Sequence, residues 1–485
     1  MLSLAAVLSA CGNDSYGNGG FGIGAKVSGG EWIWQGGFPT DSTSGVFGTK
    51  GVYGTRGMAA ASNMPGSRWL SVAWTDHAGN LWLFGGLGID SSGTYGSLND
   101  LWTYDAQKTE WAWMSGLDAA HAYNTEPAVA DVNVPAPREG AVSWVDWAGN
   151  LWLFGGGDPT GPDVGRSGDL LFNDLWRYSI STGLWTRITG SNASDAQSVC
   201  GAQDVAAPDN VPAARAGAAS WTDNAGNFWL FGGFSGSYSN DLWEFNPSTD
   251  EWSCMSGTNA ADTQGVYGTK GVAAPGNVPP GRANAVTWTD PAGNLWLFGG
   301  SGASRYDSGA YNDLWIYKPS TRQWTWKSGS STLAVIPLAF LALSNAHGVY
   351  GKQGVPAPDN MPGARSGANS WSDAAGNLWL FGGGGVDSVG HFNSLNDLWM
   401  YDPRVGEWIW VNGSDLACDL GSDGDDGCVA VYGTQGAASP SNVPLARSDA
   451  VSWSDYAGNV WLFGGQGTGV GFLNDFWEYQ RRPRR

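Results

Sequence analysis

The sequence predicts an all-β protein that is built from six repeated units of four short strands. A stretch that reads GNLWLFGG, or a close variant, occurs six times, at residues 79–86, 149–156, 226–233, 293–300, 376–383 and 458–465. Glycine and tryptophan are abundant, with 75 and 30 copies in 485 residues, whereas charged residues make up only 14%. No long segment has helical periodicity. This pattern indicates one large repeat-built domain and not several separate cores.

Each unit runs through the same elements in the same order. It opens with a strand from Arg to Trp, such as residues 138–144 (REGAVSW), and a tight Asp-x-x-Gly-Asn turn follows. The GNLWLFGG strand comes next and ends at the di-glycine. A loop of variable length leads to an Asn-Asp-Leu-Trp-x-Tyr strand, such as residues 173–178, and a short turn leads to a Trp-x-Trp strand, such as Trp408 and Trp410. Four short antiparallel strands make one blade of a β-propeller.

The two ends of the chain indicate how the ring of blades closes. The opening arginines and the Asn-Asp pairs each occur six times. The Trp-x-Trp position also occurs six times, but its first copy, Trp32 and Trp34, precedes any complete unit, and the last unit stops at Tyr479 without one. We therefore expect residues 31–34 to supply the outer strand of the blade that begins at Arg447. The predicted fold is a six-bladed β-propeller over residues 29–480, closed by the N-terminal strand.

The unit resembles the kelch repeat, in which a di-glycine follows an aromatic strand, and an Asn-Asp-aromatic-x-Tyr segment and a spaced Trp come after it. The resemblance covers residues 31–479 and implies kelch-type blades. Many kelch repeats place a His shortly after the opening Arg, and here alanines stand near that place, at Ala141, Ala218, Ala285, Ala368 and Ala450. The family includes protein-binding adaptors, sialic-acid mutarotases and copper-radical galactose oxidases. The resemblance therefore implies a fold and leaves the function open.

Strand alternation divides the connections between two faces of the predicted propeller. Short, uniform turns lie on one face, and the long, variable connections lie on the other, where we expect function. Four of the long connections are copies of one loop with Tyr, Gly and Pro at fixed offsets, which predicts an ordered surface. The opening arginines could ring the channel mouth and bind an anion, or each could pair with a loop carboxylate or carbonyl and pin the connection. These ligand-binding candidates are Arg68, Arg138, Arg215, Arg282, Arg365 and Arg447.

Most of the tryptophans are predicted to be structural. Of the 30, 28 occupy the repeated strand positions, where blade packs against blade. Trp69 and Trp147 are the two that lie outside this pattern. Trp69 follows an opening Arg and is a ligand-binding candidate on the long-loop face, whereas Trp147 lies in a turn on the opposite face.

Two insertions interrupt the repeat. Residues 333–343 (LAVIPLAFLAL) are an apolar run too short to span a bilayer, which would either dock a partner or a membrane surface or fold over the channel mouth. Residues 418–428 (CDLGSDGDDGC) are an acidic loop whose spacing does not match an EF-hand. Its weak calcium candidates are Asp419, Asp423, Asp425 and Asp426. No other metal site is predicted, because the four histidines include no pair at metal-ligand spacing.

The N-terminus and the cysteines predict export. Residues 1–11 end in LSAC, which resembles the lipobox of bacterial lipoproteins and implies that the signal peptide is removed and that Cys11 is acylated. Residues 12–28 then suit a flexible tether, and residues 481–485 (RRPRR) suit a solvated tail. The remaining four cysteines permit three pairings. We expect the disulfides Cys418–Cys428 and Cys200–Cys254, with free buried thiols as the alternative.

Charge and motifs restrict the function classes. The net charge of −20 argues against a nucleic-acid partner. No P-loop, nucleotide fingerprint or Gly-x-Ser-x-Gly motif occurs, and no cofactor is predicted. We expect a membrane-anchored, non-catalytic binding module of the bacterial periplasm or cell surface, with a protein or glycan ligand on the long-loop face. The alternatives are a carbohydrate-active enzyme of the mutarotase type, which would use channel-mouth arginines, and a structural envelope protein.

Overall fold

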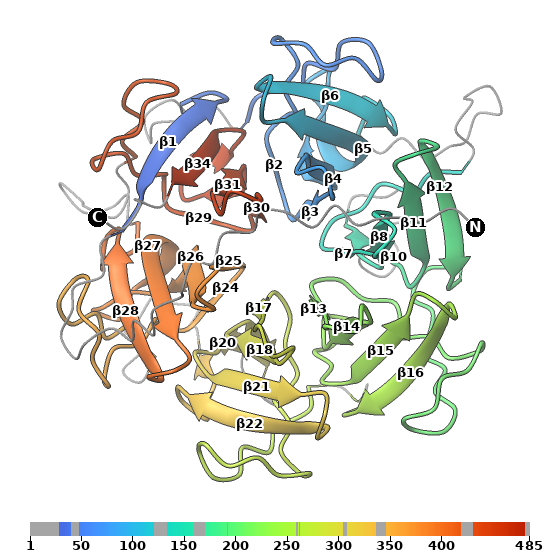
Figure 1. Ribbon diagram of the computed structural model, residues 1–485, viewed down its shortest axis with the longest axis vertical. Helices are drawn as coiled ribbons and strands as arrows, with labels where there is room; N and C mark the ends of the chain where they lie inside the picture. The colour runs from blue at the N-terminus through green and yellow to red at the C-terminus, as the bar shows by residue number, and fades with distance from the viewer. Residues whose placement is uncertain are drawn as a thin grey trace, which may run out of the picture.

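Six antiparallel sheets, four of them four-stranded and two five-stranded, are arranged around a central axis (Figure 1). The computed structural model describes residues 29–39, 48–120, 133–159, 170–191, 193–258, 260, 262–303, 308–335, 346–418 and 430–480. All regular secondary structure in these ranges is β-strand. The same ranges contain no helix with the length and apolar character that a membrane crossing needs. The predicted all-β propeller fold is confirmed.

We number the sheets as blades in chain order, and within each blade the strands run from the central axis to the rim. Blade 1 consists of β3 (Val72–Thr75), β4 (Leu81–Ile89), β5 (Tyr95–Asp105) and β6 (Glu110–Ser115). Blade 2 consists of β7 (Val142–Val145), β8 (Leu151–Phe154), β11 (Leu175–Ser179) and β12 (Leu184–Thr189). Blade 3 consists of β13 (Ala219–Thr222), β14 (Phe228–Phe231), β15 (Leu242–Asn246) and β16 (Glu251–Ser256).

The other three blades repeat this order. Blade 4 consists of β17 (Val286–Thr289), β18 (Leu295–Phe298), β21 (Leu314–Lys318) and β22 (Gln323–Ser328). Blade 5 consists of β25 (Asn369–Ser372), β26 (Leu378–Val386), β27 (Phe392–Asp402) and β28 (Glu407–Asn412). Blade 6 consists of β30 (Val451–Ser454), β31 (Val460–Phe463), β34 (Phe476–Gln480) and β1 (Glu31–Gly36).

Short strands lie in the connections between the blade strands. Three of them begin at opening arginines: β2 (Arg68–Trp69), β24 (Arg365–Ser366) and β29 (Arg447–Ser448). The others are β9 (Gly157–Asp158), β10 (Leu170–Leu171), β19 (Ser301–Ala303), β20 (Ser308–Ala310), β23 (Ala334–Val335), β32 (Gln466–Gly467) and β33 (Gly471–Phe472).

The N-terminal strand closes the ring. β1 pairs antiparallel with β34, so Trp34 lies opposite Trp477, and Figure 1 shows the two strands side by side at the rim of blade 6. The Gly30 amide also donates to the Tyr479 hydroxyl at 2.6 Å. Because the first and last of these strands share one sheet, blade 6 has all four of its strands and the ring is closed.

The repeated Asp-x-x-Gly-Asn turn and the di-glycine each have a physical explanation in the structure. In blade 1 the Asp76 carboxylate accepts the Ala78 and Asn80 amides at 2.8 and 2.9 Å, which closes the turn. Gly85 and Gly86 have φ of 59° and 93°, and the Gly86 amide donates to the Arg138 carbonyl of the next blade at 2.9 Å. A Cβ on Gly85 would lie 2.9 Å from that carbonyl oxygen. The di-glycine is therefore needed where neighbouring blades meet.

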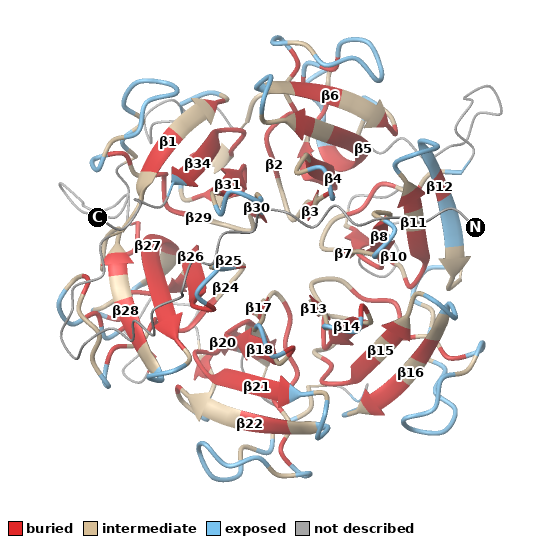
Figure 2. Ribbon diagram, in the orientation of Figure 1, coloured by how far each residue is buried: buried red, intermediate tan, exposed pale blue. Residues whose placement is uncertain are grey.

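Tryptophans fill the space between blades, as predicted. One cluster joins Trp74 and Trp82 of blade 1 to Leu151 and Trp185 of blade 2, and the Trp74 indole donates to the Trp152 carbonyl at 3.0 Å. Figure 2 shows buried residues along the blade strands and exposed residues at the connections. Burying one indole removes enough apolar surface to contribute roughly 4–6 kcal/mol before chain entropy is counted. Packing between blades thus fixes the scaffold that carries the channel.

Candidate binding site at the channel mouth

The opening arginines are buried inside the blades. Arg68 donates from both terminal nitrogens to the Asp100 carboxylate at 2.7 and 2.8 Å, and its remaining donors reach the Gly66 and Gly85 carbonyls. The other five arginines repeat this arrangement with 0–1% of the side chain exposed. The six pairs are Arg68–Asp100, Arg138–Asp174, Arg215–Asp241, Arg282–Asp313, Arg365–Asp397 and Arg447–Asp475.

This geometry corrects the predicted ring of ligand-binding arginines. Arg68, Arg138, Arg215, Arg282, Arg365 and Arg447 do not line the channel mouth. Each is neutralised by the Asp of its own blade's Asn-Asp motif, so none can serve an anionic ligand. Burial alone would lower the pKa of Arg365. The Asp397 carboxylate raises that pKa by more than burial lowers it, so the net shift is upward and the guanidinium stays charged. The alternative interpretation, that each Arg pairs with a carboxylate and pins the connection, describes what the structure shows.

The Tyr of the repeated loop reaches the same carboxylate. The Tyr53 hydroxyl donates to Asp100 Oδ2 at 2.6 Å, and the Trp102 indole donates to that oxygen at 2.7 Å. Burial, and then the Asp100 charge, raise the pKa of Tyr53 well above its ordinary value. Equivalent contacts join Tyr267 to Asp313, Tyr350 to Asp397 and Tyr432 to Asp475. The loops are therefore ordered by buried contacts, and their tyrosines are unavailable to a ligand.

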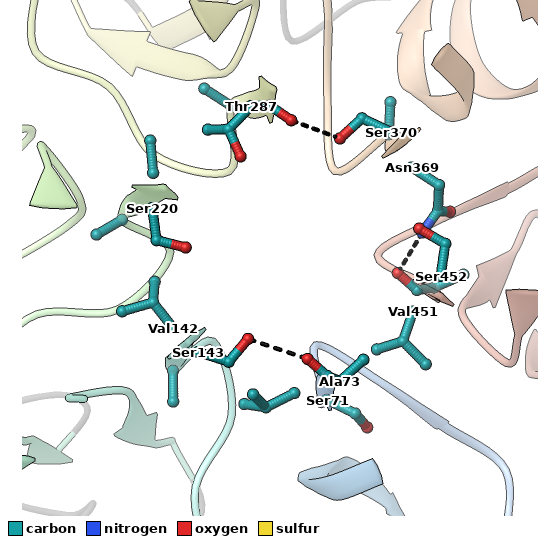
Figure 3. Close-up of a pocket in the computed structure, with 17 residues that line it drawn as sticks. Ser71, Ala73, Val142, Ser143, Ser220, Thr287, Asn369, Ser370, Val451 and Ser452 are labelled. Atoms are coloured by element: carbon teal, nitrogen blue, oxygen red, sulfur yellow. Dashed lines mark hydrogen bonds between the residues drawn. The ribbon is translucent and has the colours of Figure 1, made fainter. Parts of the chain in front are cut away.

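A narrow, uncharged channel runs between the six innermost strands. It encloses about 250 Å³ and is lined by small residues such as Ser143, Ser220 and Thr287, with Asn369 as the largest polar side chain (Figure 3). Some of these side chains tie neighbouring blades together, as when Ser143 donates to the Ala73 carbonyl at 3.1 Å. The alanines at the place of the kelch His also line the channel. The channel offers hydroxyl groups but no charged group among its described lining residues.

The channel opens on the long-loop face through a ring of six residues, one from each blade. Their backbone amides and carbonyls form a closed cycle of hydrogen bonds of 2.7–2.9 Å. All six have a φ between 51° and 64°. They are Leu70, Gly140, Gly217, Asn284, Gly367 and Asp449. Leu, Asn and Asp hold a left-handed conformation that costs about 1 kcal/mol or more, which is typical of sites where the side chain has a function.

Asn284 and Asp449 are the two polar side chains of this mouth ring. Asn284 lies against Gly217, and Asp449 lies against Gly367, so each occupies space that the neighbouring glycine leaves open. Burial raises the pKa of the Asp449 carboxyl from its ordinary value of 3.8 to about 6. The mouth cavity inside the ring holds about 170 Å³.

A side pocket of about 240 Å³ adjoins the mouth over blades 2 to 4 and shares Leu70 and Asn284 with it. Phe234 and Tyr238 form an edge-to-face pair with ring centroids 5.4 Å apart and supply an aromatic wall. Glu139 supplies a carboxylate to the same pocket. The described residues that line the side pocket and the mouth cavity include two carboxylates and neither Lys nor Arg. The site therefore favours a neutral ligand over an anion.

Trp69 directly precedes Leu70 of the mouth ring in the chain. Its ring stacks on Phe472 at 6.0 Å, and Phe472 stacks in turn on Tyr95 at 5.1 Å. Burial, and then the Glu139 charge, raise the pKa of Tyr95 above its ordinary value. Trp69 thus belongs to an aromatic stack with Phe472 and Tyr95, and it does not form one binding site with the opening arginines.

Sequence reasoning did not identify the residues of the side pocket. Glu139, Phe234, Tyr238 and Asn284 belong to no motif, and the pocket forms only when three blades are placed side by side. One signal was present: two residues after the opening Arg, three units have Gly and three have Leu70, Asn284 or Asp449. A position where Gly alternates with larger residues indicates a positive φ with a functional side chain.

Other predicted sites are placed only in part. Cys200 is disulfide-bonded to Cys254, and Cys418 is disulfide-bonded, with its predicted partner Cys428 outside the described residues. Asp419, Asp423, Asp425 and Asp426 also lie outside them, as do Cys11, the tether, the basic tail and residues 336–343 of the apolar insertion. Within the described ranges no group of three or more His, Cys, Asp or Glu residues could hold a metal ion.

Comparison with known proteins identifies the repeat. Residues 56–264 match the model of the KLHDC2/KLHL20/DRC7 Kelch-repeats domain. This part of the chain therefore carries kelch repeats. The matched span contains blades 1 to 3 of the propeller, and blades 4 to 6 repeat the same sequence motifs. The solved structure of YjhT is similar at 16% identity and a TM-score of 0.47, over 85% of this chain and 95% of that one.

Proposed function

We propose that this protein is a non-catalytic binding module, and that a neutral carbohydrate enters the side pocket and the mouth on the long-loop face. The observation that carries this proposal is the side pocket itself, a cavity of about 240 Å³ that Phe234, Tyr238, Glu139 and Asn284 help to line. Binding pockets combine apolar walls with a few polar groups that fix orientation. An aromatic wall and polar side chains suit the two kinds of surface that a sugar ring presents.

The state of the arginines supports binding over catalysis. A mutarotase-type enzyme that used channel-mouth arginines would need guanidinium groups open to the substrate. The six opening arginines are instead saturated by carboxylates and carbonyls in the blade interiors. A ring of buried, bidentate ion pairs serves the structure of the blade, and its residues are not available to a reacting sugar.

The compartment remains part of the proposal. The lipobox-like end at Cys11 supports export and lipid attachment, and the disulfide Cys200–Cys254 is of the kind that persists in an oxidising compartment. We infer a periplasmic or cell-surface location. Mass spectrometry of the mature protein, with a diacylglyceryl group sought on Cys11, tests that inference independently of ligand binding.

A glycan array with the purified protein tests the binding function. The expected result is a saturable signal that Tyr238→Ala and Asn284→Ala weaken and that Val389→Ala, an exposed side chain of the β26–β27 connection, leaves unchanged. NMR spectra of the reducing sugars in the same samples report anomer exchange. A signal without anomer exchange supports the binding module, exchange supports the enzyme, and an array without signal would contradict carbohydrate binding.

A further inference from the structure

A second set of exposed side chains lies on the short-turn face, at the far end of the channel. It occupies the residue after the Asp in each Asp-x-x-Gly-Asn turn. In chain order these residues are His77, Trp147, Asn224, Pro291, Ala374 and Tyr456. The three aromatic ones belong to blades 6, 1 and 2, which are consecutive around the ring. We call Tyr456, His77 and Trp147 the aromatic arc.

Each ring of the arc is seated on the turn glycine of the next blade. There a Cβ would contact atoms of the ring itself, so one side of each ring is covered by backbone. The three seats are Gly79 for Tyr456, Gly149 for His77 and Gly226 for Trp147. The Tyr456 hydroxyl also donates to the Asp76 carbonyl at 3.3 Å. The arc is therefore held in place head to tail across four neighbouring turns.

The other side of the rings is open to solvent. Trp147 is 74% exposed and Tyr456 is 71% exposed, which are the two largest values among the exposed apolar side chains of the described residues. The exposure of Trp147 is unusual for this chain, because none of the other 29 tryptophans is exposed. Packing between blades does not require Trp147, since other blades have Asn, Pro or Ala at its position.

The Asp carboxylates of the turns that carry the arc are engaged by hydrogen bonds within their own blades. The Asp76, Asp146 and Asp455 carboxylates accept hydrogen bonds from the Asn side chains of their own turns and from the indoles of Trp82, Trp152 and Trp461. The surface thus consists of aromatic rings with polar edges, and the turn carboxylates are held by donors of their own blades.

We propose that the aromatic arc is a second carbohydrate-binding site, which stacks the rings of a neutral oligosaccharide on Trp147 and Tyr456. Aromatic rings stack on the apolar faces of sugars, and their N–H and O–H groups bond the sugar hydroxyls. Three side chains are too small a surface for a stable protein interface, which buries about 800 Å² on each partner. The net charge of −20 opposes an anionic bilayer as the occupant. This site is separate from the mouth pocket, on the opposite face.

Fluorescence quenching tests the proposal, because Trp147 is the exposed tryptophan of the chain. The probes are cellohexaose, maltohexaose, xylohexaose and chitohexaose, added to the full chain in the presence of acrylamide. We expect at least one of them to protect part of the fluorescence from quenching. Protection should disappear with Trp147→Ala and require about tenfold more sugar with Tyr456→Ala. The melting temperature should stay unchanged, because both side chains lie at the surface.

Two controls separate this site from the mouth pocket. Tyr238→Ala changes the mouth alone, and Val405→Ala removes another exposed apolar side chain from the short-turn face, so protection should survive both. Protection that survives Trp147→Ala, or that is lost with Tyr238→Ala, would overturn the proposal. Protection by phosphatidylcholine vesicles but by none of the four sugars would overturn it in favour of a membrane surface.

Discussion

In blade 3, Cys200 is disulfide-bonded to Cys254 at the two positions that hold a tyrosine and a tryptophan in four other blades. In those blades the two rings pack edge to face, with centroids 5.1–5.4 Å apart. The four pairs are Tyr53–Trp113, Tyr267–Trp326, Tyr350–Trp410 and Tyr432–Trp34. A covalent bond and an aromatic contact thus serve one purpose, which is to hold the repeated loop against the outer strand.

Replacing the disulfide by a Tyr–Trp pair is therefore expected to be tolerated. Cys200→Ser with Cys254→Ser should lower the free energy of unfolding by up to about 4 kcal/mol, because the bond closes a long loop with a sequence separation of 54. Cys200→Tyr with Cys254→Trp should recover much of that loss, since the new hydroxyl would reach Asp241. Urea unfolding followed by near-ultraviolet circular dichroism measures both changes. A Tyr–Trp variant no more stable than the double Ser variant would contradict the equivalence.

The buried ion pairs should dominate stability. Arg365→Met leaves the Asp397 carboxylate buried without its cation, and we expect a loss of about 3–5 kcal/mol in the free energy of unfolding. Lys108→Ala, which breaks the exposed pair with Asp105, should leave the free energy of unfolding nearly unchanged. Urea unfolding compares the two. If the Arg365→Met protein kept wild-type stability but lost ligand binding, the structural role of Arg365 would be contradicted and a role in binding would be supported.

The mouth carboxyl should make stability depend on pH. The folded-state pKa of Asp449 is about 6, above the ordinary 3.8, so the folded protein keeps a proton that the unfolded chain loses. The contribution of the Asp449 carboxyl to the free energy of unfolding falls as pH rises from about 4 to about 6, and it stays low at higher pH. Asp449→Asn should add about 1–3 kcal/mol at pH 7 and little at pH 4. Asn284 at the equivalent place in blade 4 shows that Asn fits there. An equal gain at both pH values would contradict this prediction.

The buried tyrosines should resist alkaline titration. Burial raises the pKa of Tyr311 and Tyr401 to about 12, and burial followed by an Asp charge raises those of Tyr53 and Tyr350. A phenol with a raised folded-state pKa stabilises the protein below pH 10 and loses that contribution as pH rises toward the folded value. Ultraviolet absorbance should show fewer ionised tyrosines at pH 11 in the native protein than in guanidinium chloride. Coincident titration curves would contradict the burial of these hydroxyls.

The blades and their closure could be predicted from the sequence because they depend on local periodicity. The six copies of GNLWLFGG fix the strands, and the displaced Trp32–Trp34 segment fixes the closure with β34. The tryptophan packing followed from the same repetition. Residues 1–28 and residues 419–428 of the acidic insertion lie outside the described ranges, so the predictions of export and of a calcium site stay predictions.

The binding site could not be predicted to the same extent, because it depends on where side chains point. Spacing placed Arg282 at the start of the innermost strand, but only the fold shows that its side chain turns back to Asp313. The side pocket combines Glu139, Tyr238 and Asn284 from three blades, and no repeat position marks them as a group.

The most direct test of the binding function is calorimetric titration of the wild type, Tyr238→Ala and Val389→Ala with the strongest carbohydrate from the array. A contact with the aromatic wall predicts that Tyr238→Ala raises the dissociation constant by about tenfold, with the melting temperature and the Val389→Ala constant unchanged. Equal dissociation constants for all three proteins would contradict a binding site at the channel mouth.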